Sequence, residues 1–103
     1  MTIRHIVAFK FKPSITHEQR MEMFARLDGL QGHLPGMLNC TYGRSVSPEN
    51  LEHGFTYAAV MDFVDAAARD AYLDDAEHKR IGTDIVAALE GGTAGLVVCD
   101  IEI

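Results

Sequence analysis

Residues 3–11 read IRHIVAFKF, and side chains of two kinds alternate along this stretch. Every second position is apolar apart from one histidine, in the set Ile3, His5, Val7, Phe9 and Phe11. The positions between them form a mixed set, Arg4, Ile6, Ala8 and Lys10. A period of two is typical of a β-strand, because successive side chains of a strand point to opposite faces of its sheet. The stretch therefore predicts a strand, and Pro13 ends it.

Three further stretches predict strands, at residues 37–46, 55–63 and 96–103. In the first of these we expect Leu38 to share a face with Cys40, and Gly43 to form a bulge.

Two helical regions separate these strands. In the first, Thr16 and Gln19 have the spacing of a helix-capping box. Apolar residues then recur at helical spacing, at Met23, Leu27, Leu30 and Leu34. The second region begins at Asp65, and a fresh helix begins near Asp74 or Asp75, because Asp74 and Glu77 again have capping-box spacing.

The order of these elements is β-α-β-β-α-β, which predicts an α+β ferredoxin-like fold with a four-stranded antiparallel sheet. Residues 1–103 suit a single domain, with the first and third strands as central neighbours and the helices on one face. The other face would carry four apolar side chains, Ile6, Ala8, Ala58 and Val60. This face is too apolar to lie in water, so we expect a homodimer joined through the sheet faces.

Composition and charge narrow the classes of function. A chain with 48% hydrophobic and 23% charged residues has the balance of a globular domain rather than of a disordered segment. Nine basic and 15 acidic residues give a net charge of −6, which disfavours nucleic acid and anionic membrane surfaces as partners. We expect neither a membrane span nor a signal peptide, since no long apolar run is present. Cys40 and Cys99 are predicted to be buried free thiols, which indicates a cytoplasmic protein.

Four polar rings could meet between the sheet and the helices. His5 and Tyr57 share the helix-facing side of two neighbouring strands, and Tyr72 comes from the helix packed over them. On one unbroken helix Tyr72 and His78 would face different ways, but a break at Asp74 would let them converge. The same pocket would have apolar walls from Val7, Phe9, Phe24 and Leu27.

These rings suit proton transfer, but they also have purely structural interpretations. A neutral His78 could take a proton from a carbon beside a carbonyl, and Tyr72 could donate a hydrogen bond to the enolate oxygen. Alternatively, His5 is a core histidine, Tyr57 and Tyr72 are core aromatics, and His78 is a solvated residue. No histidine pair has metal-site spacing, and no phosphate loop or serine elbow is present, so we expect no metal or cofactor. Spacing alone leaves the function open.

Four stretches, in this order along the chain, carry a resemblance to a known family: MTIRHIVAFKFKPSIT, SPENLEHGFTYAAVMDF, DAYLDDAEHKR and LVVCDIEI. They are similar to the stress-responsive dimeric α/β barrel (Dabb) family over nearly the whole chain. The resemblance implies the ferredoxin-like unit predicted above, paired into a dimeric α+β barrel. Most members have no assigned reaction, while one plant member resembling this chain is a cyclase that folds a linear polyketide product by an aldol-type step.

The resemblance also implies roles for individual residues. His5, Tyr72 and His78 match the strand-one histidine, the helix tyrosine and the proposed base of that plant cyclase. Tyr57 stands where the cyclase has a histidine, and Asp75-Ala76-Glu77-His78 stands where the family often has His-Pro-x-His.

Three hypotheses follow for the function. The first is a cofactor-free lyase, cyclase or isomerase acting on a polyketide-like or other carbonyl compound, with His78 as base, Tyr72 as oxyanion donor and His5 as orienting partner. The second is a stress-associated module that binds a small molecule without catalysis. The third, by fold analogy alone, is a cofactor-independent monooxygenase.

Overall fold

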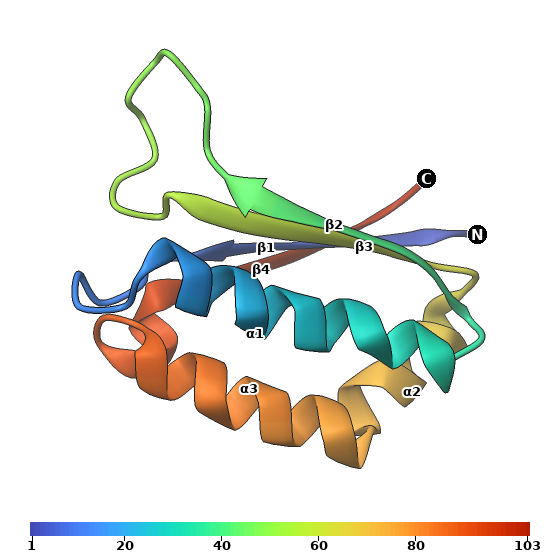
Figure 1. Cartoon of the computed structure of the whole chain (residues 1–103). Coiled ribbons are helices and arrows are strands. Elements are labelled where there is room, and N and C mark those ends of the chain that lie inside the picture. The colour runs from blue at the N-terminus through green and yellow to red at the C-terminus, as the bar shows by residue number, and fades with distance from the viewer.

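The computed structural model describes residues 1–103 as one four-stranded sheet with helices on one face (Figure 1). The strands are β1 (Ile3–Phe9), β2 (Met37–Arg44), β3 (Tyr57–Phe63) and β4 (Leu96–Glu102). The α-helices are α1 (His17–Gly29), α2 (Ala66–Asp74) and α3 (Ala76–Ala88), and short 3₁₀ turns occupy Leu30–Gly32 and Gly92–Gly95. The order of the elements confirms the predicted α+β ferredoxin-like fold.

The strand order is β2-β3-β1-β4, and all neighbouring strands are antiparallel. β1 and β3 are therefore the central pair, as predicted. His5 pairs with Met61 of β3 on one side and with Asp100 of β4 on the other. Directly paired residues project from the same face of a sheet, so Asp100 lies on the helix-covered side with His5.

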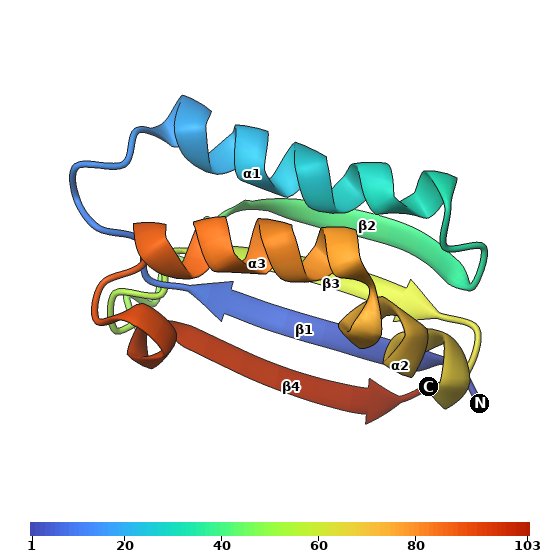
Figure 2. The same ribbon diagram turned by 90° about the horizontal axis from the view of Figure 1, so that it is seen from below.

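Helices α1 and α3 lie side by side over the sheet, and the short α2 crosses the ends of β1 and β4 (Figure 2). The predicted capping box is present at the start of α1. The Gln19 backbone N–H donates to Thr16 Oγ1 at 3.1 Å, and the Thr16 backbone N–H donates to Gln19 Oε1 at 2.8 Å. Between the two layers the core is rich in aromatic rings, and Phe24 and Phe63 are completely buried.

The start of β2 differs from the prediction. The irregularity in its pairing with β3 lies between Met37 and Asn39, whereas the sequence suggested a bulge at Gly43. The extra residue, Leu38, is 52% exposed. Because a bulge shifts the alternation of side chains by one residue, Met37 rather than Leu38 shares the core-facing side with Cys40.

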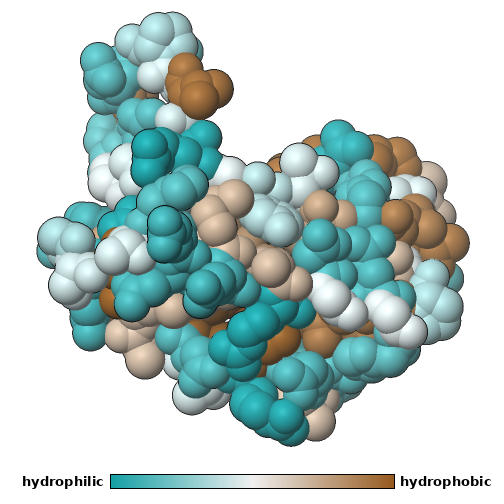
Figure 3. All heavy atoms as spheres, in the orientation of Figure 1, coloured by the Kyte–Doolittle hydropathy of each residue, from teal (hydrophilic) through white to brown (hydrophobic).

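No helix covers the opposite face of the sheet, and apolar side chains remain exposed on it. Val97 is 50% exposed and Ile101 is 44% exposed. Figure 3 shows apolar surface at the upper right of the molecule, on this uncovered side. Cys99 lies on the same face and is exposed, so the prediction of two buried thiols is wrong for Cys99, while Cys40 is half-buried.

The segment between β2 and β3, residues 45–56, projects away from the helices beside this uncovered face (Figure 1). None of the three helices has both the length and the apolar character that crossing a membrane requires.

Candidate functional site

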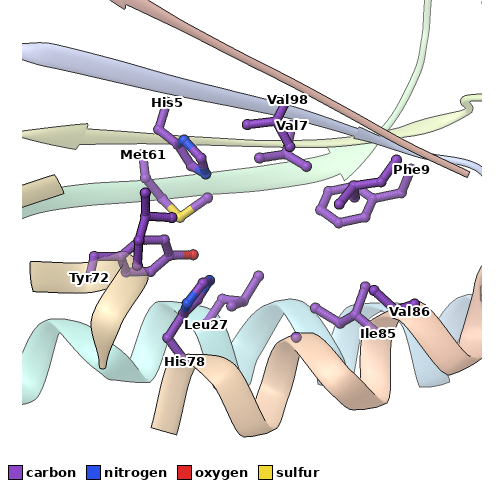
Figure 4. A pocket seen from close by; sticks show the side chains of 13 residues that line it. His5, Val7, Phe9, Leu27, Met61, Tyr72, His78, Ile85, Val86 and Val98 are labelled. Carbon is purple, nitrogen blue, oxygen red and sulfur yellow. The ribbon is translucent and has the colours of Figure 1, made fainter. Parts of the chain in front are cut away.

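A pocket of about 230 Å³ lies between the sheet and helices α2 and α3. Its walls are mostly apolar and include Val7, Phe9, Leu27, Met61, Ile85 and Val86. One end is different, because His5, Tyr72 and His78 all line it (Figure 4). The structure thus brings together six of the residues selected from the sequence, three polar rings and the apolar residues Val7, Phe9 and Leu27.

A break between α2 and α3 allows Tyr72 and His78 to meet. Asp75 ends α2 and is the N-cap of α3, and its Oδ2 accepts the His78 backbone N–H at 2.9 Å. The capping pair predicted at Asp74 and Glu77 is therefore wrong by one residue, although the predicted break is present. His78 lies in the first turn of α3, and its ring centroid is 4.0 Å from that of Tyr72 (Figure 4).

His5 approaches the same two rings from the sheet. It is only 5% exposed, and its ring meets the Tyr72 ring edge-on at a centroid distance of 5.7 Å. Its Nδ1 is 2.6 Å from Asp100 Oδ1. Asp100 was absent from the residues selected from the sequence. The sequence feature that could have pointed to Asp100 is the alternation of side chains along β4, in which Leu96, Val98 and Asp100 share the helix-facing side.

Burial and charge set the protonation of these rings. Burial, together with the neighbouring charge of His5, lowers the pKa of His78, so its imidazole is neutral at pH 7. His78 Nδ1 is buried without a hydrogen-bond partner, although the residue lines the pocket. Burial also raises the pKa of Tyr72 well above its usual value, so the phenol keeps its proton and remains a donor.

Asp100 stays ionised beside His5. Partial burial alone would raise the pKa of the Asp100 carboxyl, but hydrogen bonds from Arg69 and His5 outweigh burial and lower that pKa. The guanidinium of Arg69 reaches the second oxygen, with Nη1 2.7 Å from Asp100 Oδ2. An ionised carboxylate can only accept hydrogen bonds, so His5 Nδ1 carries a proton and donates a hydrogen bond to Asp100.

Tyr57 does not converge with the other three rings, and in this respect the sequence prediction is wrong. Tyr57 pairs with Phe9, four residues along β1 from His5, a separation of about 13 Å on a strand. Its hydroxyl is 2.7 Å from His17 Nδ1 and also accepts from the Arg44 guanidinium, with Nη2 at 3.1 Å. Sharing a sheet face is thus insufficient, because the register sets how far apart two residues lie.

Phe24 also lies outside the pocket lining. It is completely buried, and its ring packs against Phe9 and Tyr42 at centroid distances of 4.9 and 5.4 Å. Phe24 therefore belongs to the core behind the pocket wall. No group of three or more histidine, cysteine or acidic side chains is arranged to hold a metal ion.

The fold and the pocket define a class of protein, the ferredoxin-like α+β units with one uncovered sheet face and a cavity between sheet and helices. The chain belongs to the family described as the stress responsive A/B barrel domain (Dabb), whose model matches residues 3–103. The family resemblance seen in the sequence is thereby confirmed.

Three similar proteins illustrate the range of this class. Olivetolic acid cyclase from Cannabis sativa is 28% identical over 82 residues, which are 80% of this chain and 81% of the cyclase. A dimeric ferredoxin-like protein of unknown function from Jannaschia sp. CCS1 is 31% identical, with a TM-score of 0.92 and full coverage of both chains. Hydroxynitrile lyase from Passiflora edulis is 24% identical, with a TM-score of 0.85, over 99% of this chain and 93% of the lyase.

Proposed function

We propose that this protein binds a small, largely apolar carbonyl compound in the pocket and catalyses cofactor-free proton transfer, in a lyase, cyclase or isomerase reaction. The observation that carries the proposal is the meeting of two imidazoles and one phenol at one end of an apolar cavity. Two similar proteins support it, since their names are those of a cyclase and a lyase.

The proposed step uses the three rings in different roles. The imidazole of His78 takes a proton from the carbon beside the carbonyl, and the electron pair of that C–H bond moves onto the carbonyl oxygen. Tyr72 donates a hydrogen bond to the resulting enolate oxygen. The enolate carbon then either attacks a second carbonyl group, which closes a ring and leaves an alkoxide that takes the proton held by His78, or itself recovers that proton from His78. His5 orients the ligand through its Nε2.

Deuterium exchange tests this step without knowledge of the natural substrate. Methyl pentyl ketone carries one carbonyl and an apolar tail, and exchange of its protons beside the carbonyl is followed by NMR in deuterated water. His78→Gln should slow the protein-dependent exchange by 10²–10⁴-fold, the usual contribution of a general base. His53→Gln is the matched control, because His53 is exposed in the segment between β2 and β3 and does not line the pocket. Full exchange activity in His78→Gln would refute the assignment of the base.

Binding without chemistry is the second candidate, and the apolar character of most of the pocket wall favours it. Under this function, His78→Gln would bind methyl pentyl ketone as the unsubstituted protein does, and neither protein would accelerate exchange. The two candidates therefore give different results in the same experiment.

We also propose that the protein is a homodimer through its uncovered sheet face. Val97 and Ile101 are half-exposed on this face, beside the predicted contact residues Ile6 and Ala8. A similar structure is described as dimeric, which supports the proposal. Covering these side chains with a second copy would remove apolar surface from water, which is the main favourable contribution to association.

A further inference from the structure

An ion pair links the helix that carries Tyr72 to the strand next to His5. Arg69 of α2 donates from Nη1 to Asp100 Oδ2 at 2.7 Å, and its Nε bonds Asp70 at 2.8 Å. Asp100 of β4 in turn accepts from His5 Nδ1 through its other oxygen, at 2.6 Å. Three elements that lie next to one another in Figure 2, α2, β4 and β1, are thus joined by one continuous set of hydrogen bonds that ends at His5 in the pocket lining.

We propose that Arg69 is a positioning residue of the pocket, which acts through Asp100 to fix the tautomer and orientation of the His5 ring. The proposal rests on the proposed function only in treating the cavity as a ligand site. Arg69 touches neither the cavity nor the reacting atoms, so any influence on the ligand passes through Asp100 and His5.

The tautomer follows from the acceptor that faces each ring nitrogen. An ionised carboxylate requires a donor, so His5 Nδ1 carries a proton, and whenever the ring holds only this one proton its Nε2 presents a lone pair to the cavity. His5 points into the cavity beside Tyr72 (Figure 4). A charge-assisted bond of this kind favours the Nδ1-protonated form by at least about tenfold. Free histidine has the opposite preference, with the proton on Nε2.

Arg69 is needed because Asp100 lies on an edge strand. β4 pairs only with β1, and the Asp100 side chain is 24% exposed. Water can therefore compete for the carboxylate, and a free carboxylate can rotate away from His5. Arg69 holds the second oxygen and so fixes the plane of the carboxylate.

The same bond also fixes the helix that supplies the phenol. Arg69 and Tyr72 are three residues apart on α2, so they lie on the same side of this short helix. The ion pair to β4 therefore holds Tyr72 over the sheet at the distance seen from His5. One arginine thus positions two of the three polar rings.

The tautomer of His5 can be measured in the free protein, without any substrate, by ¹⁵N NMR of the imidazole nitrogens at pH 7. Arg69→Met should shift His5 part of the way toward the Nε2-protonated form, since the carboxylate remains but is free to rotate, and Arg69→Lys should restore part of the Nδ1-protonated form because a lysine can still bond Asp100. Asp100→Ala removes the acceptor of His5 Nδ1 and should give the largest change in the ratio of the two His5 tautomers, against which the Arg69 variants are compared. Arg26→Met is the matched control, since Arg26 makes a comparable 2.8 Å ion pair with Asp84 between α1 and α3.

An unchanged His5 spectrum in Arg69→Met or in Asp100→Ala would overturn the proposal, and so would an equal change in Arg26→Met. Arg69→Lys keeps the test decisive if Arg69→Met does not fold, because its expected spectrum lies between those of the unsubstituted protein and Asp100→Ala. A failure of deuterium exchange, by contrast, would refute the proposed function and leave the tautomer measurement unaffected.

Discussion

Gly82 offers a perturbation that separates the stability of the protein from the use of its pocket. It lies inside α3, it lines the pocket, and an added Cβ would meet no atom within 4 Å. Glycine inside a helix costs about 0.5–1 kcal/mol relative to alanine, since it loses more backbone freedom on folding. Gly82→Ala should therefore stabilise the protein by about 0.5–1 kcal/mol, which raises the melting temperature by roughly 2–8 °C in a domain of this size.

A larger side chain at position 82 should keep the gain in stability but remove ligand binding. Leucine is nearly as good a helix former as alanine, so Gly82→Leu should remain as stable as Gly82→Ala. Its side chain would occupy part of the 230 Å³ pocket and should abolish saturable binding of methyl pentyl ketone. Melting is followed by circular dichroism, and binding by NMR titration.

A second glycine provides the control for these substitutions. Gly29 has a right-handed helical backbone at the end of α1, is exposed, and also has no atom within 4 Å of an added Cβ. Gly29→Leu should leave ketone binding unchanged. A lower melting temperature in Gly82→Ala would refute the claims that Gly82 weakens α3 and that a Cβ fits at this position. A folded Gly82→Leu that binds the ketone normally would show that the pocket is not the binding site.

Two further predictions concern acid stability and self-association. Because burial lowers the pKa of His78 in the folded chain, the unfolded chain takes up this proton more readily. The contribution of neutral His78 to the free energy of unfolding should therefore be fully present above the unfolded pKa of about 6.5 and be lost as the pH falls below it. His78→Gln should reduce the difference between the urea midpoints at pH 5 and pH 7. Ile101→Lys should convert the proposed dimer into a monomer in analytical ultracentrifugation, whereas Val64→Lys, also at a half-exposed apolar position, should not. The Cys99 thiol should react faster with a thiol reagent in Ile101→Lys, and equal reactivity in both proteins would contradict the interface.

Features that depend on neighbouring residues of the chain could be predicted from the sequence. The alternation of residues 3–11 indicated a central strand, and the spacing of Thr16 and Gln19 indicated the first helix start. The interruption between Tyr72 and His78 was also recognisable, because an aspartate suited to an N-cap stands between them. Each of these features depends on residues that lie within a few positions of one another, so it can be recognised from the sequence alone.

Features that depend on strand register could not be predicted in the same way. Asp100 becomes a partner of His5 only through the pairing of β1 with β4, which joins residues 95 positions apart. Tyr57 was placed with His5 because both face the helices, yet the register separates them by four residues along the strand. The unanticipated bulge near Leu38 has the same origin, since an extra residue becomes evident only against the partner strand.

Three departures from good packing coincide at the pocket, and their coincidence argues for a function there. Gly82 weakens the interior of α3, His78 Nδ1 is buried without a partner, and a cavity remains in a small domain whose core is limited. Each departure reduces stability, and each could be removed by a single substitution, such as an alanine at Gly82 or an apolar residue at His78. In a sequence that otherwise agrees with its fold from capping box to core, local departures of this kind are expected at functional sites. A purely structural interpretation of His5, Tyr72 and His78 would have to account for all three in the same place.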